Sequence, residues 1–104
     1  PNDLSNKTEK DDQTIFYLLF TLMGQFVQTE VKSAVGRADA VVMLPDTIYV
    51  FEFKLSENAS AEDALKQIDA KGYLIPYSAG ERKVIKIGAE FSRTQRTLSR
   101  WVNG

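Results

Sequence analysis

The chain has 104 residues, 43% of them hydrophobic, and a formal net charge of −1, which suits one compact domain with a single core. Cysteine and histidine are both absent, which excludes disulfides, thiolate zinc sites and all imidazole catalysis. No apolar run is long enough to span a bilayer and the chain does not begin with a signal-peptide pattern, so we expect a cytoplasmic protein with no membrane partner.

Residues 1–7 are polar and predict a linker or frayed entry to a domain that spans residues 8–104. Since the chain begins with Pro and not Met, we expect that this domain was cut from a longer protein. A first helix is predicted between Thr8 as N-cap and Gly24 as C-cap. Its apolar stripe consists of Ile15, Leu18, Leu19 and Leu22, widened by Phe16, Phe20 and Met23.

Residues 25–32 predict a first strand, and residues 37–44 and 47–55 predict two more that form an antiparallel hairpin. Asp46, beside Pro45, is expected to serve only the turn between them. The 47–55 strand is apolar on both faces: Ile48 and Val50 lie on one face, and Tyr49, Phe51 and Phe53 lie on the other. A strand of this kind is covered on both sides and central in its sheet.

Two charged residues interrupt this strand. Glu52 and Lys54 are two positions apart, so they point to the same face as Ile48 and Val50. A hairpin folded about position 46 places Asp39 opposite Phe53, close to both charges. Burying charges is costly unless they are paired or bind something, and carboxylates bind hard cations such as Mg²⁺ or Mn²⁺. The alternative is an ion pair on a solvated sheet face.

Ser60 begins a second predicted helix, with Asp63 completing a capping box. We expect this helix to end between residues 76 and 80, and to include Gly72 and Ile75 in its apolar stripe. Residues 83–91 and 94–102 predict two further strands joined by a turn at residues 92–93. The order α-β-β-β-α-β-(β) indicates an α/β fold, a three-layer sandwich around a mixed sheet, with a parallel crossover through the second helix.

The last third of the chain is basic, with six Lys or Arg from Arg82 onward against Glu90 alone. These residues could contact a phosphate backbone, or they could protect solvated strand edges from pairing. The sequence does not decide between these two interpretations.

The pattern Gly36-Arg37-Ala38-Asp39, followed on the next strand by Glu52-Phe53-Lys54, resembles the PD-(D/E)xK phosphodiesterase superfamily, which has a restriction-endonuclease-like fold. The resemblance covers essentially the whole chain. The chain also resembles the nuclease-like C-terminal domain that follows an AAA-ATPase-like domain in uncharacterised bacterial proteins. An attached or partner AAA-ATPase-like domain is therefore expected.

The resemblance implies that Asp39, Glu52 and the backbone carbonyl of Phe53 bind Mg²⁺ or Mn²⁺, and that Lys54 is the catalytic lysine. Glu9 matches a first-helix glutamate that assists at the metal site, although a carboxylate there would also favour the helix dipole. Gln67 matches a second-helix glutamine. The sequence departs from the family where position 71 is Lys and the tyrosine comes later, as Tyr73, and where Ala38 replaces the proline.

The resemblance implies a metal-dependent nuclease that acts on DNA, with RNA also possible as substrate. A non-cutting module that binds nucleic acid or regulates an attached ATPase is the alternative. A small structural domain whose charges form a surface ion pair is a third interpretation.

Overall fold

A computed structural model of the chain describes residues 12–22 and 39–104. The expected N-cap Thr8, the C-cap Gly24, Glu9, Met23, the strand at 25–32 and the motif residues 36–38 lie outside these residues. Within the described part of the chain, no helix is long and apolar enough to cross a membrane.

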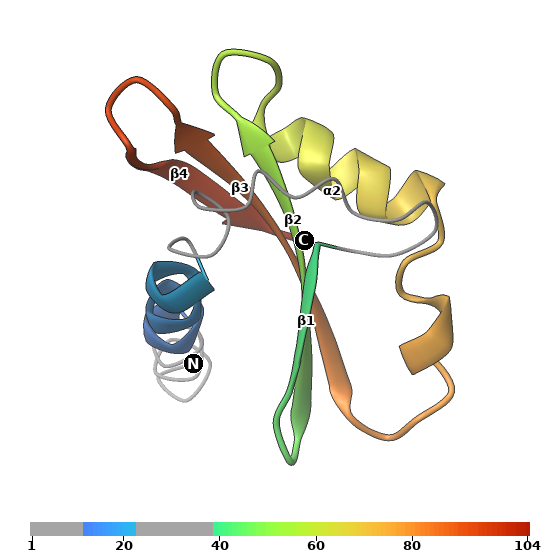
Figure 1. Cartoon of the computed structure of the whole chain (residues 1–104). Helices are drawn as coiled ribbons and strands as arrows, with labels where there is room; N and C mark the ends of the chain where they lie inside the picture. Colours follow the sequence, from blue (N-terminus) through green and yellow to red (C-terminus); the bar gives the residue numbers. More distant parts are fainter. Residues whose placement is uncertain (1–11, 23–38) are drawn as a thin grey trace, which may run out of the picture.

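The described residues form a four-stranded mixed sheet with a helix on each face (Figure 1). The strands lie in the spatial order β1-β2-β3-β4, with β2 and β3 parallel and the two outer pairs antiparallel. This confirms the predicted α/β fold class and the parallel crossover. The strands are β1 (Ala40–Met43), β2 (Thr47–Leu55), β3 (Lys83–Ser92) and β4 (Thr97–Asn103).

Strand β2 has the predicted bounds and is covered on both faces, as its two apolar faces require. Tyr49, Phe51 and Phe53 pack in one hydrophobic cluster, whereas Ile48 and Val50 belong to a second cluster on the opposite face. Each fully buried side chain of this size contributes about 1.5–3 kcal/mol to folding. Burial on both faces therefore makes β2 a strongly held element of the described sheet.

The helix over residues 12–22 covers the face of the sheet that carries Phe51 (blue in Figure 1). Ile15 and Leu19 are fully buried there, and Leu18 and Leu22 pack against the same cluster. The predicted widening of this stripe is wrong within the described residues, because Phe16 and Phe20 are 57% and 67% exposed. The buried stripe follows the i, i+3, i+4, i+7 positions alone.

The β1–β2 hairpin turns over two residues, Pro45 and Asp46, with the Leu44 N–H donating to the Thr47 carbonyl at 2.8 Å. This confirms Asp46 as a turn residue. The turn is centred between residues 45 and 46, so the register pairs Ala40 with Phe51. The predicted register, folded about position 46, is wrong by one residue.

Helix α2 (Ala61–Ala70) covers the opposite face and begins as predicted (yellow in Figure 1). The Ser60 hydroxyl accepts from the Asp63 N–H at 3.1 Å, and the Asp63 carboxylate accepts from the Ser60 N–H at 3.0 Å. This reciprocal pair is the expected capping box.

The predicted end of α2 is wrong, because the helix stops at Ala70 and Gly72 adopts a left-handed φ of 68°. The N–H groups of Gly72 and Tyr73 bond back to the carbonyls of Asp69 and Ile68, which is the Schellman arrangement that ends many helices. Ile75, assigned to the helical stripe, instead begins the 3₁₀ helix η1 (Ile75–Tyr77) and is exposed.

The β3–β4 connection is longer than predicted. Strand β3 continues to Ser92 and β4 begins only at Thr97. Between them lies a turn in which Arg96 has a positive φ of 57°. A register shift between Glu90 and Phe91 also interrupts the β3–β4 pairing, and alternating sequence patterns do not reveal such a bulge.

Candidate functional site

The candidate site lies at the carboxyl end of β2, on the face covered by α2. Glu52 shares this face with Ile48 and Val50, and all three side chains are buried. Lys54 is the last residue but one of β2, and 24% of its side chain is exposed. The alternative of an ion pair on a solvated sheet face is therefore wrong.

Glu52 is a buried carboxylate with an incomplete set of partners. Its Oε2 accepts a hydrogen bond from Gln67 Nε2 at 2.8 Å. Its Oε1 is buried and receives no hydrogen bond from the described part of the chain. Burial raises the pKa of Glu52 to about 7, with a further increase from the Asp39 carboxylate, while Lys54 and the backbone of Asp39 act in the opposite direction. A group of this kind favours a cation or a proton at its open oxygen.

Lys54 is held between β2 and α2. Its Nζ lies 4.0 Å from Glu52 Oε2 and donates a hydrogen bond to Gln67 Oε1. The Lys54 side chain is partly open to solvent while its ammonium remains beside the carboxylate.

Gln67 connects the other site residues. Its Oε1 accepts from Lys54, and its Nε2 donates both to Glu52 and, at 3.2 Å, to the Tyr73 hydroxyl. Both halves of one amide are thus used, which fixes its orientation by complementarity. The structure brings Gln67 into the group that the sequence predicted.

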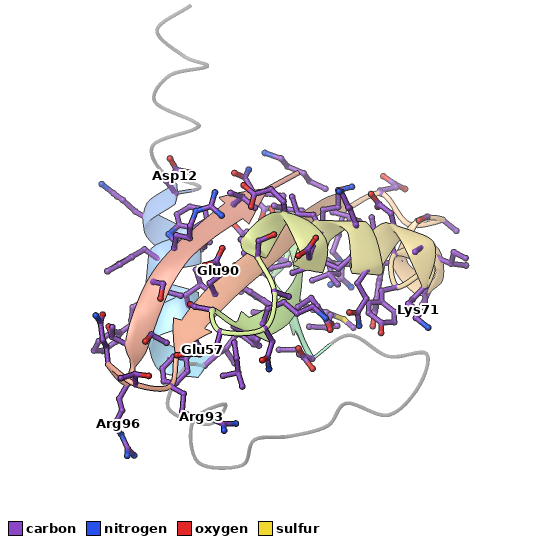
Figure 2. The ribbon with its side chains drawn as sticks, turned by 90° about the horizontal axis from the view of Figure 1, so that it is seen from above. Asp12, Glu57, Lys71, Glu90, Arg93 and Arg96 are labelled. Carbon is purple, nitrogen blue, oxygen red and sulfur yellow. The ribbon has the colours of Figure 1, made fainter. Side chains whose placement is uncertain are left out.

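Tyr73 also contacts the site, although the sequence did not show whether this displaced tyrosine would reach it. It is buried against α2, and its hydroxyl accepts from Gln67 although the two residues are six positions apart. The left-handed Gly72 turns the chain back at the helix end, which brings Tyr73 to this position. The glycine directly before Tyr73 was the available signal. Lys71, at the spacing where the family has tyrosine, is exposed at the far end of α2 (Figure 2).

Asp39 lies just before β1 and bonds directly to β2. Its Oδ2 accepts from the Phe53 N–H at 2.8 Å. The negative charge of Asp39 is one of the causes that raise the pKa of Glu52. In an antiparallel pair, the N–H and C=O of one residue point to the same neighbour, so the Phe53 carbonyl faces the edge that carries Asp39.

The donor set suits a hard divalent cation. Two carboxylates and a backbone carbonyl are oxygen ligands of the kind that Mg²⁺ and Mn²⁺ prefer, and the open Glu52 Oε1 is an unused acceptor. In residues 12–22 and 39–104 no three acidic, histidine or cysteine side chains form a group able to hold a metal. Glu9, the third carboxylate implied by the resemblance, lies outside those residues.

The basic residues of the last third are partly neutralised within the fold. Lys86 pairs with Asp69 at 2.6 Å, and Arg100 pairs with Glu62 and Glu90 at 2.5 and 2.9 Å. Arg93 and Arg96 lie at the β3–β4 turn (Figure 2). Two of the six basic residues, Lys86 and Arg100, therefore form ion pairs within the domain. Contact between the two turn arginines and a phosphate backbone stays a prediction.

The sequence is similar to known proteins over most of its length. A sequence model of the PD-(D/E)XK nuclease superfamily matches residues 7–101. A protein of Azotobacter chroococcum mcd 1, named "Uncharacterized protein in vnfD 5'region", is 36% identical over 85 residues. That alignment covers 82% of this chain but 16% of the relative, so the chain spans less than a fifth of that protein's length. No solved structure matches.

Proposed function

Because this chain belongs to the PD-(D/E)XK nuclease superfamily, we propose that the domain hydrolyses phosphodiester bonds in DNA with the help of Mg²⁺ or Mn²⁺. The observation that carries the proposal is the buried Glu52, whose Oε1 has no partner in the described chain while Oε2 is fixed by Gln67. A carboxylate kept in this state is costly unless it has a ligand to bind.

The residues that would hold the ion are Asp39, Glu52 and the carbonyl of Phe53, with Glu9 as a further carboxylate. When bound, the ion supplies Lewis acidity toward the phosphoryl group and the attacking water. Asp39 accepts from the Phe53 N–H, so its carboxylate is presented from a side chain that is anchored to β2. Fixed ligands of this kind reduce the reorganisation needed at the moment of reaction.

Lys54 is assigned the role of orienting the attacking water and offsetting negative charge that develops on the phosphoryl oxygens. Support comes from its partial exposure and from the contacts that hold its ammonium beside Glu52. Gln67 positions both residues, since one amide bonds to each. An ammonium held in place can stabilise the transition state without first being ordered.

The test is cleavage of supercoiled plasmid and of single-stranded DNA and RNA oligonucleotides, with Mg²⁺ or Mn²⁺, by the wild type and Lys54→Ala. We expect the wild type to cut and Lys54→Ala to stay folded by circular dichroism but to lose cleavage. Lys71→Ala, which alters an exposed lysine at the end of α2, is the matched control and should retain full activity.

Two results would contradict the proposal. Cleavage that survives Lys54→Ala would remove the catalytic role of this lysine. A wild type that binds nucleic acid but cuts nothing with either metal would favour the non-cutting module of an AAA-ATPase-like protein.

A further inference from the structure

Helix α2 rests on β3 through residues at alternate positions of that strand, which therefore share one face. Lys86 pairs with Asp69 near the end of α2, Gly88 lies beneath the helix, and Glu90 contacts its first residue. None of the three belongs to the family motif described above, yet together they determine where α2 sits on the sheet.

Gly88 permits the close approach of the helix. A Cβ at this position would lie 2.9 Å from the Cβ of Ala64 and still closer to the carbonyl oxygen of Ala61. The backbone atom cannot rotate away as a side chain could, so a larger residue must push α2 outward. Gly88 is also the register partner of Glu52, so this close approach occurs beside the buried carboxylate.

Glu90 fixes the start of the helix. Its Oε2 accepts from the Ala61 N–H at 2.8 Å and from Arg100 Nη1 at 2.9 Å. Figure 2 shows Glu90 beside the start of α2. Glu90 is the register partner of Lys54 on the neighbouring strand, but its carboxylate bonds to the first residue of α2 and to Arg100. Lys54 is thereby left to bond with Gln67.

Gln67 follows Ala64 by three positions, so the two are neighbours on one side of α2. The height of Ala64 above the sheet therefore determines whether the amide of Gln67 can reach both Glu52 and Lys54. We infer that Gly88 and Glu90 are positioning residues for the site, and that they act through α2 to hold Gln67 between the carboxylate and the ammonium. The catalytic meaning of this inference rests on the proposed function.

The experiment follows the side-chain amide signals of Gln67 by ¹⁵N–¹H NMR in the metal-free protein, assigned by their loss in Gln67→Glu. In Gly88→Ala we expect these signals to move toward the shifts of a solvent-exposed glutamine while circular dichroism still shows a folded domain. Cleavage should fall by about 100-fold, the order expected when a site is misplaced by about 1 Å. Gly80→Ala is the matched control, because a Cβ there has its nearest neighbour at an ordinary 3.9 Å.

A second pair of variants applies if Gly88→Ala does not fold. Glu90→Leu removes the acceptor for the Ala61 N–H and should shift the Gln67 signals, whereas Glu90→Gln keeps an acceptor and should restore them. Unchanged Gln67 signals in a folded Gly88→Ala or in Glu90→Leu would overturn the inference, even if cleavage fell. If the wild type cuts nothing, the proposed function fails, and the Gln67 signals still decide whether β3 positions this amide.

Discussion

Gln67 Nε2 donates to Glu52 Oε2 at 2.8 Å, so an amide on a surface helix holds one oxygen of a carboxylate that is buried in the sheet. The other oxygen is left without a partner in the described residues. This asymmetry gives Glu52 a fixed orientation together with an unused acceptor.

Divalent metal should stabilise the domain through the predicted site. A ligand that binds only the folded state adds RT ln(1 + [L]/Kd), which is about 2.7 kcal/mol at a hundredfold excess over Kd. Thermal melting with and without millimolar Mg²⁺ or Mn²⁺ measures this gain. Asp39→Asn should lose most of it, and an equal gain in both proteins would contradict the site.

The metal-free domain should lose stability as the pH rises from about 4.5 to about 7. The pKa of Glu52 is raised from 4.5 to about 7 in the folded state, so between these values the folded state binds the proton more tightly than the unfolded state. Rising pH removes that proton and costs at most about 3 kcal/mol. Urea denaturation at several pH values should show a larger decline in the wild type than in Glu52→Gln, and equal slopes would count against the shift.

Replacement of Gln67 by Leu should destabilise the metal-free domain. The substitution leaves Glu52 Oε2 and the Tyr73 hydroxyl without the amide donor, and an unsatisfied buried polar group costs about 1–3 kcal/mol. Chemical denaturation provides the measurement. Lys71→Ala, on the exposed end of the same helix, should stay within about 0.5 kcal/mol; a comparable loss there would mean that a general sensitivity of this helix to substitution, and not the lost contacts, explains the effect.

Gly72→Ala should destabilise the end of α2. Gly72 has φ 68°, and an added Cβ would come within 2.8 Å of Ile75 Cδ1. The left-handed conformation alone costs a non-glycine residue about 1–2 kcal/mol. Denaturation of this variant beside Gly80→Ala tests the prediction, since the control glycine has room for a methyl group. Equal stability of the two variants would refute it.

Prediction from sequence was strongest where local chemistry and packing agree. The bounds of β2 follow from its turn residues and its two apolar faces, and the start of α2 follows from the Ser60–Asp63 box. Strand periodicity also places Glu52 and Lys54 on one face. These features depend on spacing along the chain, which the sequence contains directly.

The errors arose where a single residue changes the path of the backbone. The left-handed Gly72 ends α2 earlier than the apolar stripe predicts, and that early end brings Tyr73 to Gln67. A hairpin turn centred between two residues shifts the register by one. The fit of Gly88 beneath Ala61 and Ala64 is a tertiary contact, and periodicity carries no information about how closely a helix approaches a sheet.

The unequal pairing of β2 has a consequence for the timing of motion at the site. Within residues 39–104, β2 pairs with β3 along nine residues but with β1 along four, and Asp39 precedes those four. Local opening is easiest where few buried contacts must break, so amide hydrogens near Asp39 should exchange faster than those around Glu52. We therefore expect the two carboxylates to lie in regions that open at different rates, and an ion bound by both would slow the opening of the faster region.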